Sequence, residues 1–167
     1  MNNAGLNLPS DVFTDLLRAS LEKGSLIRFQ ATGWSMSPFI KDGDLLTILP
    51  FNEKAPRIGQ VVTFIQPHDS NVLVHRIISK HRQSCLIKGD NTPGRHDGLI
   101  PIENILGFVE KINRNGRDVW FGLGVERIPI SLLSRINFRV PILTFVRFLD
   151  RNTRQQVKRK HNSPSEK

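Results

Sequence analysis

Residues 60–78, QVVTFIQPHDSNVLVHRII, contain the pattern that decides the fold of this chain. Two runs rich in β-branched and apolar residues, 60–67 and 71–78, flank the short polar segment 68–70. Paired runs of this length around a short turn are typical of an antiparallel β-hairpin. We therefore predict a hairpin here, with the second strand carrying the sequence VHR at positions 74–76.

Similar short patterns extend outward from this hairpin in both directions. Apolar or alternating runs predict strands at 25–32, 45–51 and 84–88, and a further strand pair, 105–113 and 117–121, across Asn115-Gly116. Residues 9–23 have helical spacing and end at Gly24, whereas 89–98 are dense in Gly, Asp, Asn and Pro and predict a loop. Because no βαβ alternation occurs, the pattern favours a compact, mostly β domain of the α+β class over a doubly wound sheet.

The charge is concentrated in the last quarter of the chain. Residues 1–127 have a net charge of +2, whereas residues 128–167 have a net charge of +7. Residues 128–149 are apolar but interrupted by arginines, which predicts two amphipathic helices hinged at Pro141. We therefore expect a β domain with its N-terminal helix at 1–127, a helical appendage at 128–150 and a flexible basic tail at 151–167.

Composition excludes several classes of protein. The single cysteine, Cys85, cannot form an internal disulfide, so a disulfide-stapled secreted scaffold is excluded. No apolar run of about 18 residues predicts a spanning helix, and the first residues lack the pattern of a cleaved secretory signal. We expect a protein that is cytoplasmic or peripheral on a membrane. Nucleic acid is an unlikely partner, because the body is nearly neutral and contains no tyrosine.

A serine, a histidine and two aspartates, side chains that suit nucleophilic catalysis, occur on or between the predicted strands. Ser35 lies in the segment GWSMSP that ends a predicted strand, and His75 lies on the second hairpin strand. Asp90 and Asp97 lie in the Gly-rich loop. A histidine can remove the serine proton, and an aspartate can orient the imidazole. The backbone N–H of Ser35 could stabilise an oxyanion. Taken singly, the same residues are explained as a turn serine, a half-buried strand histidine and turn-forming aspartates.

The order of the motifs favours the catalytic interpretation. Residues 26–109 resemble the signal peptidase I superfamily, which includes the LexA-type self-cleaving repressors, in six motifs: GWSMSP at 33–38, DGD at 42–44, IGQVVTF at 58–64, VHRII at 74–78, KGDN at 88–91 and ILGFV at 105–109. Histidine at position 75 is similar to the endoplasmic reticulum, archaeal and sporulation-type branch, whereas other branches have a lysine base there. Motif matches of this kind are hypotheses that a structure must test.

The resemblance implies a serine peptidase with a signal peptidase/LexA-like β domain and no cofactor or metal. Ser35 carries over as the nucleophile and His75 as the general base, with Asp97 as the preferred orienting aspartate and Asp90 as the alternative. Lys88 matches a motif lysine that is not the family's base. A precursor peptide with small residues at the cleavage site is the implied substrate, bound as an added strand. Phe39 and Ile40, and the run 45–49, are candidates for its pockets, with core packing as the alternative.

The chain departs from the histidine branch in three ways. Gly33 stands where that branch has a hydroxyl residue, so an oxyanion hole would depend on main-chain N–H groups. Trp34 replaces a glycine; it could wall the substrate cleft, but core packing is its default explanation. A helix at 9–23 stands in place of the expected membrane anchor, whereas residues 128–160 suit contact with an anionic membrane surface.

Two other functions remain open from the sequence. A LexA-like self-cleaving protein would need a scissile segment such as Ala4-Gly5, but no DNA-binding domain precedes it and the base is histidine. The same fold could instead serve as a catalytically inactive binding module.

Overall fold

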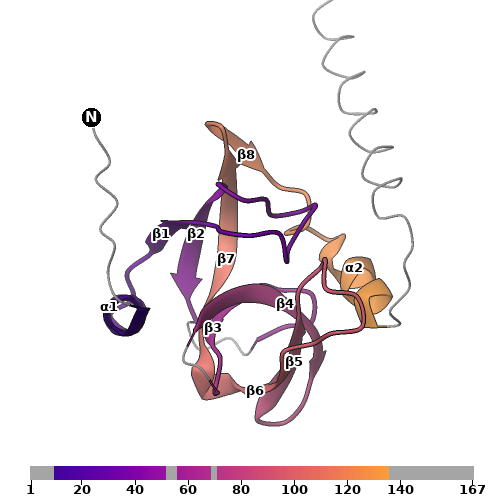
Figure 1. Cartoon of the computed structure of the whole chain (residues 1–167), viewed down its shortest axis with the longest axis horizontal. Helices are drawn as coiled ribbons and strands as arrows, with labels where there is room; N and C mark the ends of the chain where they lie inside the picture. The colour runs from indigo at the N-terminus through magenta and orange to yellow at the C-terminus, as the bar shows by residue number, and fades with distance from the viewer. Residues whose placement is uncertain (1–9, 52–55, 69–70, 136–167) are drawn as a thin grey trace, which may run out of the picture.

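The computed structural model describes residues 10–51, 56–68 and 71–135. It contains an antiparallel sheet in the order β1-β2-β7-β3-β4-β5-β6, with β8 paired to β7 (Figure 1). The strands are β1 (Ile27–Gln30), β2 (Leu45–Pro50), β3 (Val61–Ile65), β4 (Val72–Lys80), β5 (Ser84–Lys88), β6 (Gly98–Pro101), β7 (Ile105–Arg114) and β8 (Arg117–Val119). Helices α1 (Ser10–Glu22) and α2 (Arg127–Arg135) complete a mostly β, α+β fold, as predicted.

The predicted central hairpin is formed by β3 and β4. Val62 pairs with His75, and Ile65 pairs with Val72. β4 is the longer strand, and it pairs with β5 only from Arg76 onward. The first half of β4 therefore keeps one edge that no neighbouring strand of the described chain covers.

Two buried clusters make up the core, and β3 contributes to both. Val61 packs with Leu17 and Leu21 of α1 and with residues of β2 and β7, whereas Val62 packs with Ile77 and Ile87. Successive residues of a strand point to opposite faces, so the uniformly apolar sequence of β3 serves both clusters.

The other predicted elements agree with the structure within a few residues, apart from one strand. Asn115 and Gly116 both have positive φ, 51° and 77°, as the turn between β7 and β8 requires. Strand β6 was not predicted, because its four residues follow the Gly-rich loop and lack a strand-like run of their own. It forms by pairing with β5, from Gly98 opposite Ile87 to Pro101 opposite Ser84.

The first of the two predicted C-terminal helices is α2, which begins at Arg127 and ends at Arg135. It packs against β4, and the Lys88 Nζ donates a hydrogen bond to the Ser134 carbonyl at 2.8 Å. The second predicted helix, the tail at 151–167 and Ala4-Gly5 lie outside the described residues. Within the described chain, neither helix has the length and hydropathy needed to cross a bilayer.

Candidate active site

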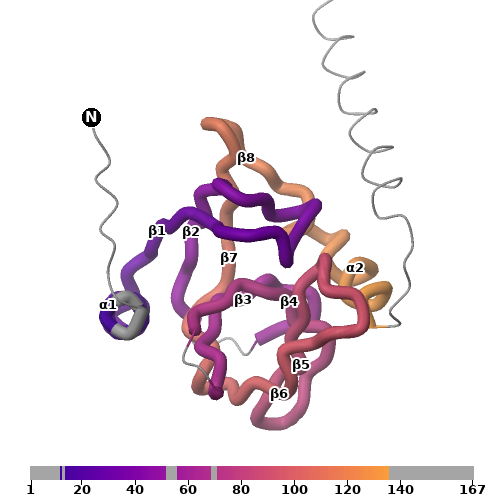
Figure 2. The backbone as a smooth tube through the Cα atoms, viewed as in Figure 1, coloured from indigo at the N-terminus to yellow at the C-terminus, as the bar shows by residue number. Residues whose placement is uncertain are grey.

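Ser35 lies in the segment 31–44 that joins β1 to β2. The ends of this segment are held together, because the Ala31 N–H donates to the Asp44 carbonyl and the Gly43 N–H to the Ala31 carbonyl. Gly33 adopts φ +82°, which favours glycine, and its N–H donates to the Asp42 carboxylate at 2.8 Å. Figure 2 follows this segment as it extends toward the loop between β5 and β6. The turn thus presents Ser35 beyond the end of β1.

His75 joins the predicted serine to one of the two predicted aspartates. Its Nε2 lies 2.8 Å from the Ser35 Oγ, and its Nδ1 lies 2.7 Å from the Asp97 Oδ2. The ring is almost completely buried and packs near Phe64, with ring centroids 6.2 Å apart. Side chains separated by 40 and 22 positions in the sequence therefore meet in one hydrogen-bonded chain.

Asp97 determines which nitrogen of His75 carries the proton in the neutral ring. Its carboxylate can only accept, so Nδ1 must be the donor, which leaves Nε2 free to accept the Ser35 hydroxyl proton. The Asp97 backbone is itself fixed, because its N–H donates to the Ile87 carbonyl at 2.9 Å. This arrangement has the polarity that a serine nucleophile with a histidine base requires.

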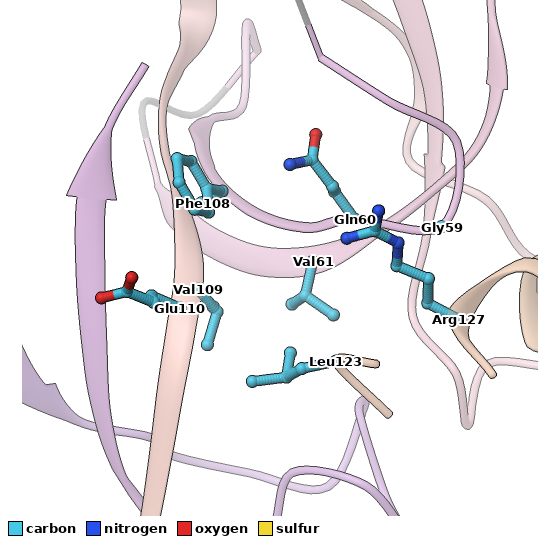
Figure 3. Close-up of a pocket in the computed structure, with 8 residues that line it drawn as sticks. All are labelled: Gly59, Gln60, Val61, Phe108, Val109, Glu110, Leu123 and Arg127. Atoms are coloured by element: carbon cyan, nitrogen blue, oxygen red, sulfur yellow. The ribbon is translucent and has the colours of Figure 1, made fainter. Parts of the chain in front are cut away.

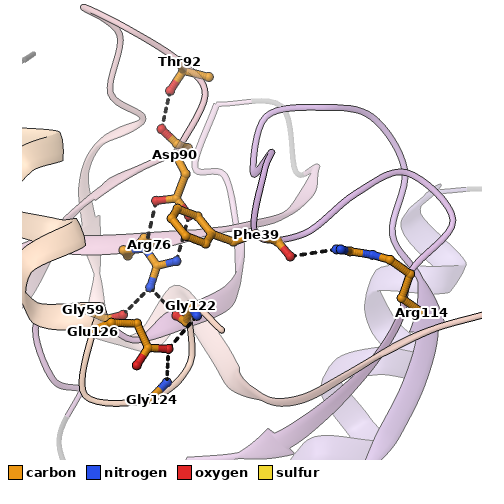
Figure 4. A network of polar contacts seen from close by, with 10 residues as sticks. Phe39, Gly59, Arg76, Asp90, Thr92, Arg114, Gly122, Gly124 and Glu126 are labelled. Carbon is orange, nitrogen blue, oxygen red and sulfur yellow. Dashed lines mark hydrogen bonds and ion pairs between the residues drawn. The ribbon is translucent and has the colours of Figure 1, made fainter. Parts of the chain in front are cut away.

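Asp90 does not contact His75, so its prediction as an orienting residue is wrong. Its two carboxylate oxygens accept from the Nε and Nη2 of Arg76 at 2.8 and 2.7 Å, and both side chains are fully buried. Arg76 also donates to the carbonyls of Gly59 and Gly122 and lies over the Phe39 ring (Figure 4). Because Arg76 follows His75 on β4, its side chain points to the opposite face.

Gly89 also belongs to the candidate site, although it was not predicted as a site residue. A Cβ at this position would lie 2.8 Å from the Ser35 carbonyl oxygen and 3.1 Å from the His75 Nε2. Only a residue without a side chain lets the end of β5 approach the serine and histidine this closely. The sequence clue to this glycine is its place in the KGDN motif, directly before Asp90, which binds Arg76.

Asn91 connects the same loop to the serine. Its N–H donates to the Ser35 carbonyl at 2.7 Å, and its side-chain amide donates to the Trp34 carbonyl at 3.2 Å. The residues after β5 thus hold the backbone on either side of the nucleophile.

Lys88 is buried beside this loop but does not bond to Ser35. Its ammonium group donates to the Ser134 carbonyl. Burial lowers the pKa of Lys88, and the nearby negative charge of Asp90 opposes that shift only in part. The lysine therefore attaches α2 to the end of β5.

The predicted substrate-contacting residues Phe39 and Ile40 lie in the interior, with 3% and 4% of their surface exposed. Phe39 packs against Phe121, with ring centroids 5.4 Å apart, and Ile40 belongs to the core cluster that includes α1. Both side chains anchor the segment 31–44 to the core and do not line a surface. The expectation that they contact a substrate is therefore wrong for both. Leu46 and Ile48 of the run 45–49 are likewise fully buried, whereas Trp34, expected to pack in the core, is 64% exposed.

A pocket of about 180 Å³ lies between the start of β3, β7 and the start of α2. Figure 3 shows Val61 and Leu123 pointing toward one another there, with Arg127 nearby. Ser35, His75 and Asp97 are not among its lining residues. Within residues 10–51, 56–68 and 71–135, no three His, Cys, Asp or Glu side chains are grouped as metal ligands.

No protein-family model matches the chain, and no curated protein matches it.

Proposed function

We propose that this protein is a serine endopeptidase of the signal peptidase I type, with Ser35 as nucleophile and His75 as general base. The observation that carries the proposal is the continuous hydrogen-bonded chain from the Ser35 Oγ through His75 to Asp97, with distances of 2.8 and 2.7 Å. A hydroxyl, an imidazole and a carboxylate in this order match the roles that acyl transfer needs. The order of the motifs along residues 26–109 supports the same class.

In the proposed reaction, Ser35 attacks the carbonyl carbon of the scissile peptide while His75 accepts the hydroxyl proton. The imidazolium forms beside the Asp97 carboxylate, which stabilises the positive charge. His75 then donates the proton to the leaving amine as the carbon–nitrogen bond breaks. A water molecule, deprotonated by the same ring, hydrolyses the acyl-enzyme and regenerates the Ser35 hydroxyl.

The backbone N–H of Ser35 is the proposed donor to the oxyanion. Within the part of the chain that the structure describes, this N–H has no hydrogen-bonded acceptor of its own. Gly33, two residues earlier, cannot supply a side-chain donor. Stabilisation of the tetrahedral intermediate therefore depends on main-chain groups, which already point in a fixed direction before the substrate binds.

An extended peptide is the proposed form of the substrate. Among the strands that the structure describes, β1 pairs with β2 alone and the first half of β4 pairs with β3 alone, so each has one edge without a paired strand. Half-buried apolar side chains beside these edges, Ala31, Val72 and Val74, pack against the core on one side and are the proposed contacts for the small residues of a precursor. Added-strand pairing would supply affinity through main-chain hydrogen bonds.

Labelling with a serine-directed fluorophosphonate probe tests the proposal. We expect the full chain to gain one adduct at Ser35, and Ser35→Ala and His75→Ala to gain none. Ser37→Ala and His96→Ala are matched controls, because they change a second serine of the same turn and an exposed histidine beside Asp97. A folded protein that never labels would contradict the enzyme assignment and favour a binding module.

A mass measurement on the purified protein separates peptidase from self-cleaving protein. A peptidase acting on other chains keeps its full mass during incubation. Loss of the first four residues that depends on Ser35 would favour self-cleavage at Ala4-Gly5.

A further inference from the structure

Four large apolar side chains are exposed in the stretch of chain from the end of β8 to the middle of α2. Trp120 is 68% exposed and Val125 is 89% exposed, and Ile128 and Leu132 are each 52% exposed. We call these four residues the 120–132 patch. Single exposed apolar residues are ordinary on a protein surface, whereas exposed apolar residues one turn apart on a helix are typical of an interaction face.

Local hydrogen bonds shape the backbone of this stretch. The Leu123 N–H donates to the Trp120 carbonyl in a turn before α2, and the Ile128 N–H donates to the Val125 carbonyl where α2 begins. Ile128 and Leu132 are four residues apart and share one helical face. Ser131, by contrast, is completely buried. The face of α2 that carries Ile128 and Leu132 therefore points away from the body of the described chain.

Charge distinguishes this face from an exposed apolar face on α1. On α1, Val12 and Leu16 are also four residues apart and are exposed to a similar degree, 46% and 57%. Residues 10–22 contain three acidic residues and one basic residue, whereas residues 128–167 contain two acidic and nine basic ones. An anionic surface would repel the first helix and attract the second.

We propose that the 120–132 patch docks this protein peripherally on an anionic lipid bilayer. Tryptophan is enriched at the membrane–water interface, and an amphipathic helix lies in that plane with its apolar side chains among the acyl chains. Basic residues next to the helix add attraction to anionic headgroups that salt screens. Since Lys88 attaches α2 to the end of β5 beside Gly89, docking would also hold the Ser35 site close to the bilayer.

Vesicle sedimentation with the full chain tests this docking. We expect binding to vesicles that contain phosphatidylglycerol, weak binding to pure phosphatidylcholine, and loss of binding as salt rises. Ile128→Ser with Leu132→Ser should weaken binding at least about tenfold, because two apolar side chains no longer enter the bilayer. The matched double variant Val12→Ser with Leu16→Ser should change binding less than about twofold.

Fluorescence gives a second measurement that does not depend on the stability of the double variant. The chain has two tryptophans, so Trp34→Phe leaves Trp120 as the only one. We expect its emission to shift to shorter wavelength when anionic vesicles are added. An unshifted emission, equal loss of binding in the α1 and α2 double variants, or tighter binding to duplex DNA than to anionic vesicles would each overturn the proposal.

The docking does not depend on the proposed enzymatic activity. Vesicle binding by Ser35→Ala should equal that of the unchanged protein. Loss of binding in Ile128→Ser with Leu132→Ser should leave probe labelling in solution unchanged.

Discussion

At the scale of single residues, two aspartates of one loop have different roles although their sequence contexts are alike. Asp97 accepts a hydrogen bond from His75, whereas Asp90 forms a buried ion pair with Arg76. The loop turns between them, so the two carboxylates reach opposite faces of β4. One aspartate therefore contacts the candidate base, and the other neutralises a buried arginine.

Asp97→Asn and Asp90→Asn should separate these two effects. Asp97→Asn should slow probe labelling by about 10²–10⁴-fold, because an amide neither fixes the tautomer nor stabilises the imidazolium. Asp90→Asn should lower the free energy of unfolding by about 3 kcal/mol, because Arg76 remains buried without its counter-charge. Urea unfolding and labelling rates measure both, and a large stability loss in Asp97→Asn with normal labelling would contradict the assignment.

Gly89→Ala should reduce labelling at least about a hundredfold, because the new methyl group would displace the Ser35 carbonyl or the His75 ring. Gly94→Ala is the matched control from the same loop. Gly94 has open space around it but a φ of +72°, so its substitution should cost only about 1 kcal/mol of stability. Equal labelling rates for the two variants would show that the close approach at Gly89 is unimportant.

At the scale of elements, the segment 31–44 depends on an ion pair to β7. The Asp44 carboxylate, 2% exposed, accepts two hydrogen bonds from Arg114 at 2.8 and 2.7 Å. Arg114 also donates to the Phe39 carbonyl at 2.9 Å. Burial alone would raise the pKa of Asp44, but hydrogen bonds from Arg114 and the Lys41 N–H outweigh it, and the pKa is lowered below 3.8.

This lowered pKa predicts an acid-sensitive contribution to stability. The contribution is complete above the unfolded-state value near 3.8 and is lost as the pH falls through the folded-state value. Asp44→Asn should therefore reduce the free energy of unfolding by about 2 kcal/mol at neutral pH. The difference between variant and unchanged protein should narrow below about pH 4, as urea unfolding across pH 2–7 would measure. A difference that stays constant with pH would contradict this account.

At the scale of the whole molecule, α2 is tied to the body that carries the candidate site. Lys88 donates to the Ser134 carbonyl, Ser131 is fully buried, and a Cβ at Gly59 would lie 2.8 Å from the Arg127 carbonyl oxygen. The predicted division of the chain after residue 127 falls in the first turn of this helix. Sequence periodicity recognised the helix but not the surface on which it packs.

Two truncations measure what α2 contributes. A chain ending at residue 135 keeps every described contact of α2 and should still label at Ser35. A chain ending at residue 126 should be about 2 kcal/mol less stable than the chain ending at residue 135, because the hydrogen bond from Lys88 to the Ser134 carbonyl is lost and the surface of β4 under α2 is exposed. Equal stability of the two truncated chains in urea would contradict this role of α2.

The sequence by itself determined the elements whose signal is local. The strands β3 and β4, the Asn115-Gly116 turn and the helix α1 follow from periodicity and turn chemistry, which depend on near neighbours. Periodicity could not indicate β6, because that strand exists only through its pairing with β5. The sequence also identified Ser35, His75 and the two aspartates as candidates, through motif order.

Only the tertiary structure decided what these candidates touch. His75 contacts Asp97 and not Asp90 because of the face of β4 on which its ring lies. In the segment 31–44, the face that a side chain occupies decides whether it is buried, as Phe39 and Ile40 are, or exposed, as Trp34 is. The need for glycine at position 89 depends on the approach of a backbone 54 positions earlier in the sequence, at Ser35. Such contacts arise when strands that are distant in the sequence pair in the fold. A local pattern of residues does not indicate which distant segments will come together.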